Sequence, residues 1–239
     1  MTNRFRIFPN SDLQISMEPL RKVNTVGAPR VTAEFSSRKM GKAIPCESLI
    51  ELDFLIRAEL DPEVEEIYAQ PVELTLEGQR RHIPDFALGV NGLLEIHEVK
   101  VDWVAARPET AAKLKAAARH VEERGAPYLV ALQSFLRAPP IYERLNDIFR
   151  RLHEHVSLDT RLAVLDQLQN IGPISIRDAA LRTRRWGATE ERVLALVAQG
   201  DIRIDLTTAI CPESMVWSAD SYPYPTRLIP DFAMGRVDA

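Results

Sequence analysis

Apolar and polar positions between residues 43 and 135 follow the periods of helices and strands. Apolar residues at helical spacing predict a helix over Glu47–Leu60, which Asp61-Pro62 ends. Four extended segments are expected next: Ile67–Gln70, Val72–Leu76, Arg81–Val90 and Leu93–Val101. A helix over Pro108–Arg124, ended by Gly125, then precedes the strand Tyr128–Leu132. Strand, helix and strand in this order imply a right-handed parallel crossover. Residues 43–135 are therefore expected to form an α/β sandwich containing a three-stranded meander.

The pattern from residue 136 onward is mostly helical. A helix after Pro139-Pro140, within residues 136–156, is expected to connect the first domain to a second one over residues 157–217. The second domain is predicted to hold three helices and a two-stranded wing, built from Leu158–Leu168, a helix from Ser175, a helix from Thr189 to Gly200, and strands over Asp201–Leu206 and Met215–Trp217. These elements suggest an α-rich winged helix. Residues 218–239 resemble an extended tail.

Composition places the chain among globular proteins of the cytoplasm. Of its 239 residues 46% are hydrophobic and 27% charged, which is typical of a packed domain. Charged residues interrupt the apolar stretches, and the polar start has no signal-peptide core, so no membrane association is expected. Cys46 and Cys211 lie far apart without a metal-binding spacing, which fits a reducing compartment.

Positive charge is concentrated at the start of the chain. Residues 1–42 hold eight Lys and Arg against three Asp and Glu, although the whole chain has a net charge of -4. Such a basic N-terminal arm could contact phosphates, and the alternative is a flexible solvated tail.

The dipeptide Asn91-Gly92 is a strong signal for a two-residue hairpin turn. With that turn Val90 faces Leu93, and continuing the register places Asp85 opposite Glu98. Directly opposed side chains are about 5 Å apart, so two carboxylates there need a cation or a proton between them. Lys100 is the next residue on the same face.

A third carboxylate lies on the first helix. Glu51 has Phe54, Leu55 and Ala58 at helical spacing, within an apolar stripe where a charge is costly. Three carboxylates and a lysine are the parts of a Mg²⁺-dependent phosphodiester hydrolase, because Mg²⁺ prefers oxygen ligands. Asp85, Glu98 and the carbonyl of Val99 would hold the metal, with Mn²⁺ as a possible substitute. Lys100 would orient a water, and Glu51 would hold a second ion or a metal-bound water.

The Pro-Asp-Phe part of this motif occurs twice in the chain, so the two copies can be compared. Pro230-Asp231-Phe232 repeats Pro84-Asp85-Phe86, but no Glu-x-Lys strand follows the second copy, which is interpreted as part of the tail. The alternative for the first copy is a surface hairpin with incidental acids. No nucleophile elbow, Walker A loop or dinucleotide fingerprint occurs. Trp103, Trp186 and Trp217 are expected at core or boundary positions.

These motifs together resemble a known family. Glu47-Ser48-Leu49-Ile50-Glu51, Phe54-Leu55, Asp61-Pro62-Glu63-Val64, Gln70-Pro71, Pro84-Asp85-Phe86 and Glu98-Val99-Lys100 are similar to TnsA, the endonuclease subunit of heteromeric transposases. The resemblance implies a restriction-endonuclease-like PD-(D/E)XK core over about residues 35–135 and a winged-helix domain over about 157–217. The family's catalytic positions fall on Glu51, Asp85, Glu98 and Lys100.

The resemblance also implies a division of labour on DNA. A TnsA-like subunit nicks the 5′ ends of a transposon, a TnsB-type DDE transposase cuts the 3′ ends, and a TnsC-type AAA+ ATPase contacts the C-terminal part. Such a protein would work in the bacterial cytoplasm, associated with the nucleoid when on DNA. Arg38, Lys39 and Lys42 suit DNA contact, whereas the acidic start of the helix after Thr189 favours protein contact.

Two alternatives remain open at this point. One is a stand-alone restriction or repair nuclease of the same fold, which would cut DNA without partners. The other is a non-catalytic winged-helix DNA-binding scaffold, which would have no need for Glu51 within an apolar stripe.

Overall fold

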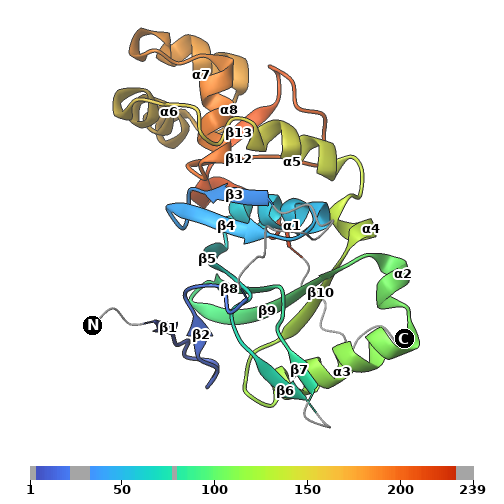
Figure 1. Cartoon of the computed structure of the whole chain (residues 1–239). Helices are drawn as coiled ribbons and strands as arrows, with labels where there is room; N and C mark the ends of the chain where they lie inside the picture. The colour runs from blue at the N-terminus through green and yellow to red at the C-terminus, as the bar shows by residue number, and fades with distance from the viewer. Residues whose placement is uncertain (1–3, 22–32, 77–79, 230–239) are drawn as a thin grey trace. The chain divides into compact units, whose positions relative to one another are not determined.

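The structure is a computed structural model that describes residues 4–21, 33–76 and 80–229. The contacts between residues divide the chain into two units. Figure 1 shows the whole chain, coloured from the N-terminus to the C-terminus. The first unit contains the described residues up to Arg137 together with Arg227–Ile229, and the second contains Ala138–Thr226. The boundary after Arg137 lies two residues beyond the end of the predicted nuclease domain.

A four-stranded mixed sheet is the centre of the first unit (Figure 1). Its strand order is β10, β9, β8, β5, with the bounds Tyr128–Leu132, Leu93–Lys100, Phe86–Val90 and Val64–Ala69. The strands β5, β8 and β9 are antiparallel neighbours, and β10 is parallel to β9. Helix α3 (Pro108–Glu122) connects β9 to β10. The predicted meander and parallel crossover are therefore confirmed.

The two faces of this sheet carry different helices. Helix α1 (Leu49–Leu60) covers one face, where the ring of Phe54 stacks on Phe86 at 5.1 Å between centroids and contacts His97 at 5.2 Å. The alternate residues Leu94 and Ile96 point to the other face, into a core that also contains buried residues of α3. The central sheet is thus covered on both faces.

The hairpin between β8 and β9 has the register that its turn residues predict. Val90 pairs with Leu93, and the pairing continues to Phe86 with His97. Both turn residues, Asn91 and Gly92, have positive φ. This register places Asp85, just before β8, beside the end of β9.

The extended segment predicted over Arg81–Val90 is in fact two strands. Strand β7 (Arg80–His82) pairs with β6 (Leu74–Leu76) in a separate two-stranded sheet, and β8 begins only at Phe86. Pro84 lies between them and has no N–H to donate to a ladder, which explains why the strand breaks there. This break brings His82 into the candidate site described below.

The described part of residues 1–42 belongs to the fold of the first unit rather than to a free arm. It forms two small sheets, whose strands are β1 (Phe5–Arg6), β2 (Ile15–Ser16), β3 (Ala33–Ser37) and, extending past residue 42, β4 (Lys42–Cys46). Phe8, Ile15 and Phe35 are fully buried. The flexible-tail alternative is therefore wrong for these residues, because Phe8, Ile15 and Phe35 pack into the core of the first unit even though Phe5 and Ile7 between the basic residues are exposed.

The second unit combines helices with a small sheet. Its helices are α5 (Ile141–Phe149), α6 (Leu158–Ile171), α7 (Ile176–Thr183) and α8 (Glu190–Ala198), with the 3-10 turns η2 (Arg184–Trp186) and η3 (Ala219–Ser221). The side chains of Ser157, Ser175 and Thr189 accept hydrogen bonds at the helix starts, as expected for N-caps. The sheet order is β11 (Ile174–Ser175), β13 (Met215–Ser218), β12 (Ile202–Ile204).

Two features of the second unit differ from the sequence prediction. Strand β11 adds a third strand to the predicted two-stranded wing. Helix α5, predicted as a connection, packs within the second unit through buried Leu145 and Ile148, and Arg144 donates to the carbonyl of Leu206 at 2.6 Å.

The predicted tail over residues 218–239 is folded where it is described. Its beginning forms η3, and Arg227–Ile229 return to the first unit. There the backbone N–H groups of Leu228 and Ile229 donate to Asp61 at 2.6 and 3.2 Å, and Ile229 is buried. The second Pro-Asp-Phe copy, at residues 230–232, lies outside the described residues.

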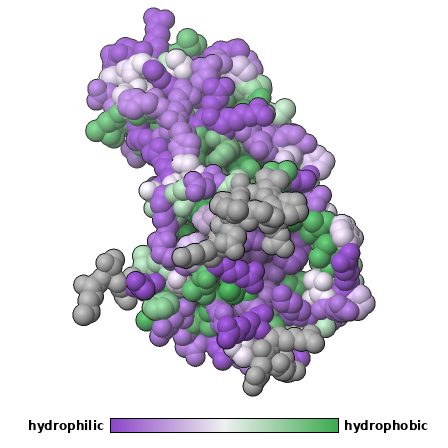
Figure 2. Space-filling model, in the orientation of Figure 1, coloured by the Kyte–Doolittle hydropathy of each residue, from purple (hydrophilic) through white to green (hydrophobic). Residues whose placement is uncertain are grey.

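The coloured part of the face seen in Figure 2 is mainly hydrophilic, with small hydrophobic patches between polar residues. None of the helices in the described ranges combines the length and hydropathy that a membrane span requires.

Candidate active site

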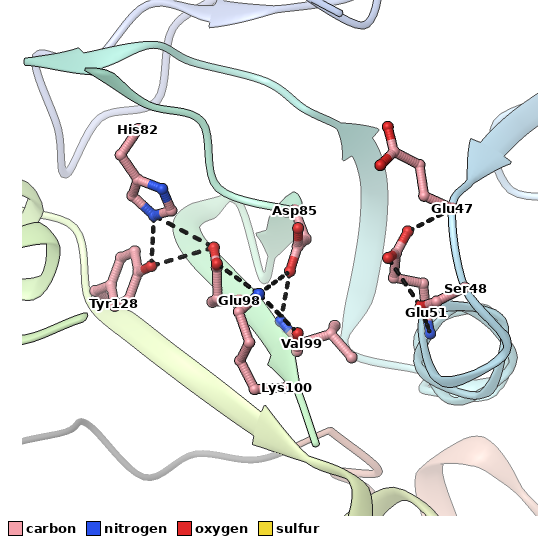
Figure 3. Close-up of polar contacts among 9 residues, drawn as sticks. All are labelled: Glu47, Ser48, Glu51, His82, Asp85, Glu98, Val99, Lys100 and Tyr128. Carbon is pink, nitrogen blue, oxygen red and sulfur yellow. Dashed lines mark hydrogen bonds and ion pairs between the residues drawn. The ribbon is translucent and has the colours of Figure 1, made fainter. Parts of the chain in front are cut away.

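Asp85 and the end of β9 meet at one point of the central sheet (Figure 3). The Oδ2 atom of Asp85 accepts a hydrogen bond from the backbone N–H of Val99 at 2.8 Å. The carbonyl of Asp85 accepts another from the N–H of Gln70 at 2.8 Å. Asp85 is therefore held by β9 on one side and by the residue after β5 on the other.

The ammonium of Lys100 lies at the centre of three oxygens. It is 2.7 Å from Glu98 Oε1, 3.3 Å from Asp85 Oδ2 and 3.0 Å from the carbonyl oxygen of Val99. The hairpin register predicts that two facing carboxylates need a positive charge, and Lys100 supplies it. The predicted metal ligands thus already surround one cationic group.

The two carboxylates of this cluster differ in acidity. Burial, and next the nearby charge of Glu98, raise the pKa of Asp85 to about 8, against the charge of Lys100, which lowers it. Burial also opposes the ionisation of Glu98, but a hydrogen bond from His82 and the charge of Lys100 outweigh it and lower its pKa to about 2. Asp85 is therefore the weaker acid of the two.

Lys100 remains a cation in this environment. Burial lowers the pKa of its ammonium, but the charges of Asp85 and Glu98 more than offset that effect and raise the pKa above its ordinary value. A charged amine is therefore available beside the two carboxylates at neutral pH.

Two residues that the sequence analysis did not identify hold the second oxygen of Glu98. The hydroxyl of Tyr128 donates to Glu98 Oε2 at 3.3 Å. His82 Nε2 lies 3.3 Å from the same oxygen and 3.0 Å from the Tyr128 hydroxyl. All three side chains are buried. With Oε2 held by this pair, Oε1 is directed toward Lys100 (Figure 3).

The sequence offered little sign of these two residues. Tyr128 is the only residue with a hydroxyl in the apolar segment Tyr128–Leu132, which is a weak indication of a buried polar partner. His82 belongs to β7, whose sheet is separate from that of Glu98, so no strand register connects the two.

Glu51 is not joined to this cluster. Its Oε2 accepts from the N–H of Glu47 at 2.7 Å and its Oε1 from the Ser48 hydroxyl at 2.9 Å, while Ser48 Oγ accepts from the N–H of Glu51 at 3.2 Å. This reciprocal arrangement at the start of α1 is a variant of the capping box, in which Glu51 accepts from the N–H of Glu47 instead of that of the cap residue Ser48. The structure therefore gives Glu51 a local role that the apolar stripe did not indicate.

The charge of Glu51 nevertheless affects the acidity of Asp85. It contributes to the raised pKa of Asp85. The pKa of Glu51 itself is raised by burial, against the hydrogen bonds from Glu47 and Ser48, which lower it. Within the described ranges no group of three or more His, Cys, Asp and Glu is close enough to hold a metal ion together. The direct donor set is accordingly two carboxylates and the Val99 carbonyl.

The three cations expected to contact DNA have different surroundings. The ammonium of Lys39 donates to the carbonyls of Ala58, Asp61 and Val64, so it stabilises the end of α1. Lys42 donates to the carbonyl of Met17 at 2.8 Å. Arg38 is exposed, and its backbone N–H donates to Glu59 at 2.8 Å. The geometry thus leaves Arg38 as the best placed of the three for a phosphate.

The donor set fits a hard divalent cation. Two carboxylate oxygens and one carbonyl oxygen are the ligand types that Mg²⁺ prefers, and their convergence on the Lys100 ammonium shows that they can face one positive centre. Such a site could activate water and bind phosphate.

No family model matches the chain, and none of the curated proteins matches it either.

Proposed function

We propose that this protein is a Mg²⁺-dependent DNA endonuclease with a PD-(D/E)XK core, which nicks the 5′ ends of a transposon as the TnsA-type partner of a DDE transposase. One observation carries this proposal: Asp85, Glu98 and the Val99 carbonyl converge on one cationic centre, and that centre is the amine of the Glu-x-Lys motif. A surface hairpin with incidental acids would not bury Glu98 or surround Lys100 with three oxygens.

The metal would be held by Asp85, Glu98 and the carbonyl of Val99, with Mn²⁺ as a possible substitute. When bound, Mg²⁺ would polarise the scissile phosphate and lower the pKa of a bound water. Lys100 stays charged and lies beside the same oxygens, where it can orient the attacking water and stabilise negative charge on the phosphate. His82 and Tyr128 keep Glu98 in position.

The arrangement of the remaining helices and strands supports the same proposed function. The first unit has α1, the antiparallel meander β5, β8 and β9, then α3 and the parallel strand β10, the order that the nuclease core requires. The second unit has α6, α7 and α8 beside a small antiparallel sheet, consistent with a winged helix. Glu190 and Glu191 open α8, which favours a protein partner such as a TnsC-type AAA+ ATPase over groove reading.

Strand-specific nicking tests the proposal. The full chain is mixed with labelled DNA carrying transposon ends, Mg²⁺, a TnsB-type DDE transposase and a TnsC-type AAA+ ATPase. We expect a nick at the 5′ ends only, seen on a denaturing gel. Cutting of both strands by the chain alone would favour the stand-alone nuclease. DNA binding without any metal-dependent cut would favour the non-catalytic scaffold.

Replacing Glu51 by glutamine separates its two roles. Glutamine can keep the capping box with Ser48, so we expect the free energy of unfolding to change by less than about 0.5 kcal/mol. We expect nicking to fall about tenfold or more, because the charge near Asp85 would no longer hold a metal-bound water. Single-turnover nicking and urea unfolding are the measurements. Unchanged nicking would leave Glu51 as a capping residue only.

Replacing Tyr128 by phenylalanine tests the support of Glu98. The variant loses the hydroxyl that donates to Glu98 Oε2, so we expect the dissociation constant for Mn²⁺, measured by calorimetry, to rise about tenfold. Tyr222→Phe is the matched control, since that hydroxyl donates to the carbonyl of Ile204 in the second unit. Equal Mn²⁺ affinity in both variants would show that Tyr128 is not needed to orient Glu98.

A further inference from the structure

Trp103 lies on the surface three residues after the lysine of the candidate site. Its side chain is 62% exposed, whereas Trp186 and Trp217 are half-buried. The prediction that Trp103 occupies a core or boundary position is therefore wrong. A single exposed hydrophobic side chain needs no special explanation, so a binding role for Trp103 has to rest on what surrounds it.

The turn that carries Trp103 is firmly held. Trp103 belongs to the short helix α2 (Asp102–Ala105), in which the N–H of Ala105 donates to the carbonyl of Val101 at 3.0 Å. The carboxylate of Asp102 accepts from both the N–H and the hydroxyl of Ser134, in helix α4 (Gln133–Leu136). The exposed ring is therefore presented at a defined place beside the end of β9.

An arginine covers part of the same ring. The guanidinium carbon of Arg107 lies 4.3 Å from the centre of the Trp103 ring, and Arg107 is itself exposed. An arginine and an aromatic ring in this arrangement form a cation–π pair that keeps the guanidinium in place. The ring still has most of its surface in solvent, so it can stack on a further planar group.

We propose that Trp103 and Arg107 form a DNA-binding surface next to the phosphate that is cut. Trp103 stacks on a base exposed at the nick, and Arg107 binds a neighbouring phosphate, since aromatic stacking and arginine charge together bind unpaired nucleotides. This inference rests on the proposed nuclease function, because it uses the position of Lys100 as the place where the phosphate lies.

The charge of the adjoining helix favours DNA over a protein partner. Helix α3 begins directly after Arg107 and exposes Lys113, Lys115 and Arg119 along its length. The same helix also exposes Glu109 and Glu122, so its exposed cations outnumber its exposed acids by three to two, and Lys115 and Arg119, four residues apart, share one face. This net positive charge suits a phosphate backbone.

DNA binding by the full chain without cutting tests the inference. The Asp85→Asn background in EDTA prevents hydrolysis, and the probe is a fluorescein-labelled duplex with a short single-stranded gap, measured by anisotropy at low salt. We expect Trp103→Ala to weaken binding about tenfold or more and Trp103→Phe to weaken it less, because phenylalanine still stacks. Arg107→Ala should also weaken binding and reduce the dependence of affinity on salt by about one phosphate contact.

Trp186→Ala is the matched control, because Arg185 covers the ring of Trp186 at 3.6 Å in the second unit. We expect that variant to bind the gapped duplex as the Asp85→Asn parent does. Parental affinity in both Trp103→Ala and Arg107→Ala would overturn this inference alone, and loss of transposase capture in those variants would then identify a protein interface. Absence of any DNA binding by the parent would overturn the proposed function as well. If Trp103→Ala fails to fold, judged by its melting temperature, Arg107→Ala decides the question.

Discussion

Asp85→Asn should abolish nicking while the protein remains folded. The substitution removes one of the two carboxylates that face the Lys100 ammonium, and losing the metal's contribution of about 4 kcal/mol to transition-state stabilisation corresponds to about a thousandfold in rate. The side chain keeps its shape, and its amide oxygen can still accept from the N–H of Val99. We therefore expect no measurable nicking of transposon-end DNA and no Mn²⁺ binding by calorimetry.

The stability of the same variant provides an internal check. Burial, with the charge of Glu98, raises the pKa of Asp85 to about 8 in the folded protein, well above the ordinary pKa of an aspartate in the unfolded chain. Between these two pKa values the unfolded chain loses the proton more readily than the folded protein, so the folded state loses stability as the pH rises toward 8. Neutral asparagine removes that cost, and the melting temperature at pH 8 should be no lower than that of the parent. Asp147→Asn, at an exposed position in α5, should nick DNA normally. Parental nicking by Asp85→Asn would refute the site.

Gly125→Ala should cause a large loss of stability in the first unit. Gly125 has a φ of +85°, and a Cβ there would lie 2.1 Å from the carbonyl oxygen of Asn10. Asn10 is itself joined to β9, because its side chain accepts from the N–H of Leu94 at 2.8 Å and donates to its carbonyl at 3.1 Å. Backbone strain and the overlap together should cost about 4 kcal/mol.

Gly92→Ala separates the two causes. Gly92 has a φ of +76°, but a Cβ there would meet nothing within 4 Å. The Gly92→Ala substitution should therefore lower the free energy of unfolding by about 1 kcal/mol, from the left-handed backbone alone. Urea unfolding followed by circular dichroism measures both variants. Equal losses would mean that residues 4–21 do not pack against Gly125 in solution.

The core of the fold could be predicted because its signals are local. The helix α1 begins after the Ser48 cap and ends before Asp61-Pro62, and Asn91-Gly92 sets the register of β8 and β9. Capping residues, breakers and turn residues act over a few positions, so they can be recognised without knowing the rest of the structure. The proximity of Asp85 and Glu98 follows from the same turn.

The errors have a different origin. Pro84 could have indicated the break between β7 and β8, since proline cannot donate to a strand ladder. The burial of Phe8 and Ile15 and the return of Ile229 to the first unit had no comparable signal. These contacts join segments far apart in the chain, and their energy comes from apolar area that only the folded chain can bury.

The same distinction runs through the candidate site. Interactions within a few residues determined the hairpin, and the hairpin register in turn placed Asp85, Glu98 and Lys100 on the same face of the sheet. Packing between distant segments specified that His82 and Tyr128 hold Glu98, and it also left Trp103 in solvent. The capping box of Glu51 is local, yet the distance of that carboxylate from the cluster depends on how α1 lies on the sheet. A turn constrains residues within a few peptide bonds of it, whereas contacts across layers depend on side-chain volumes that are matched only when the whole unit has folded.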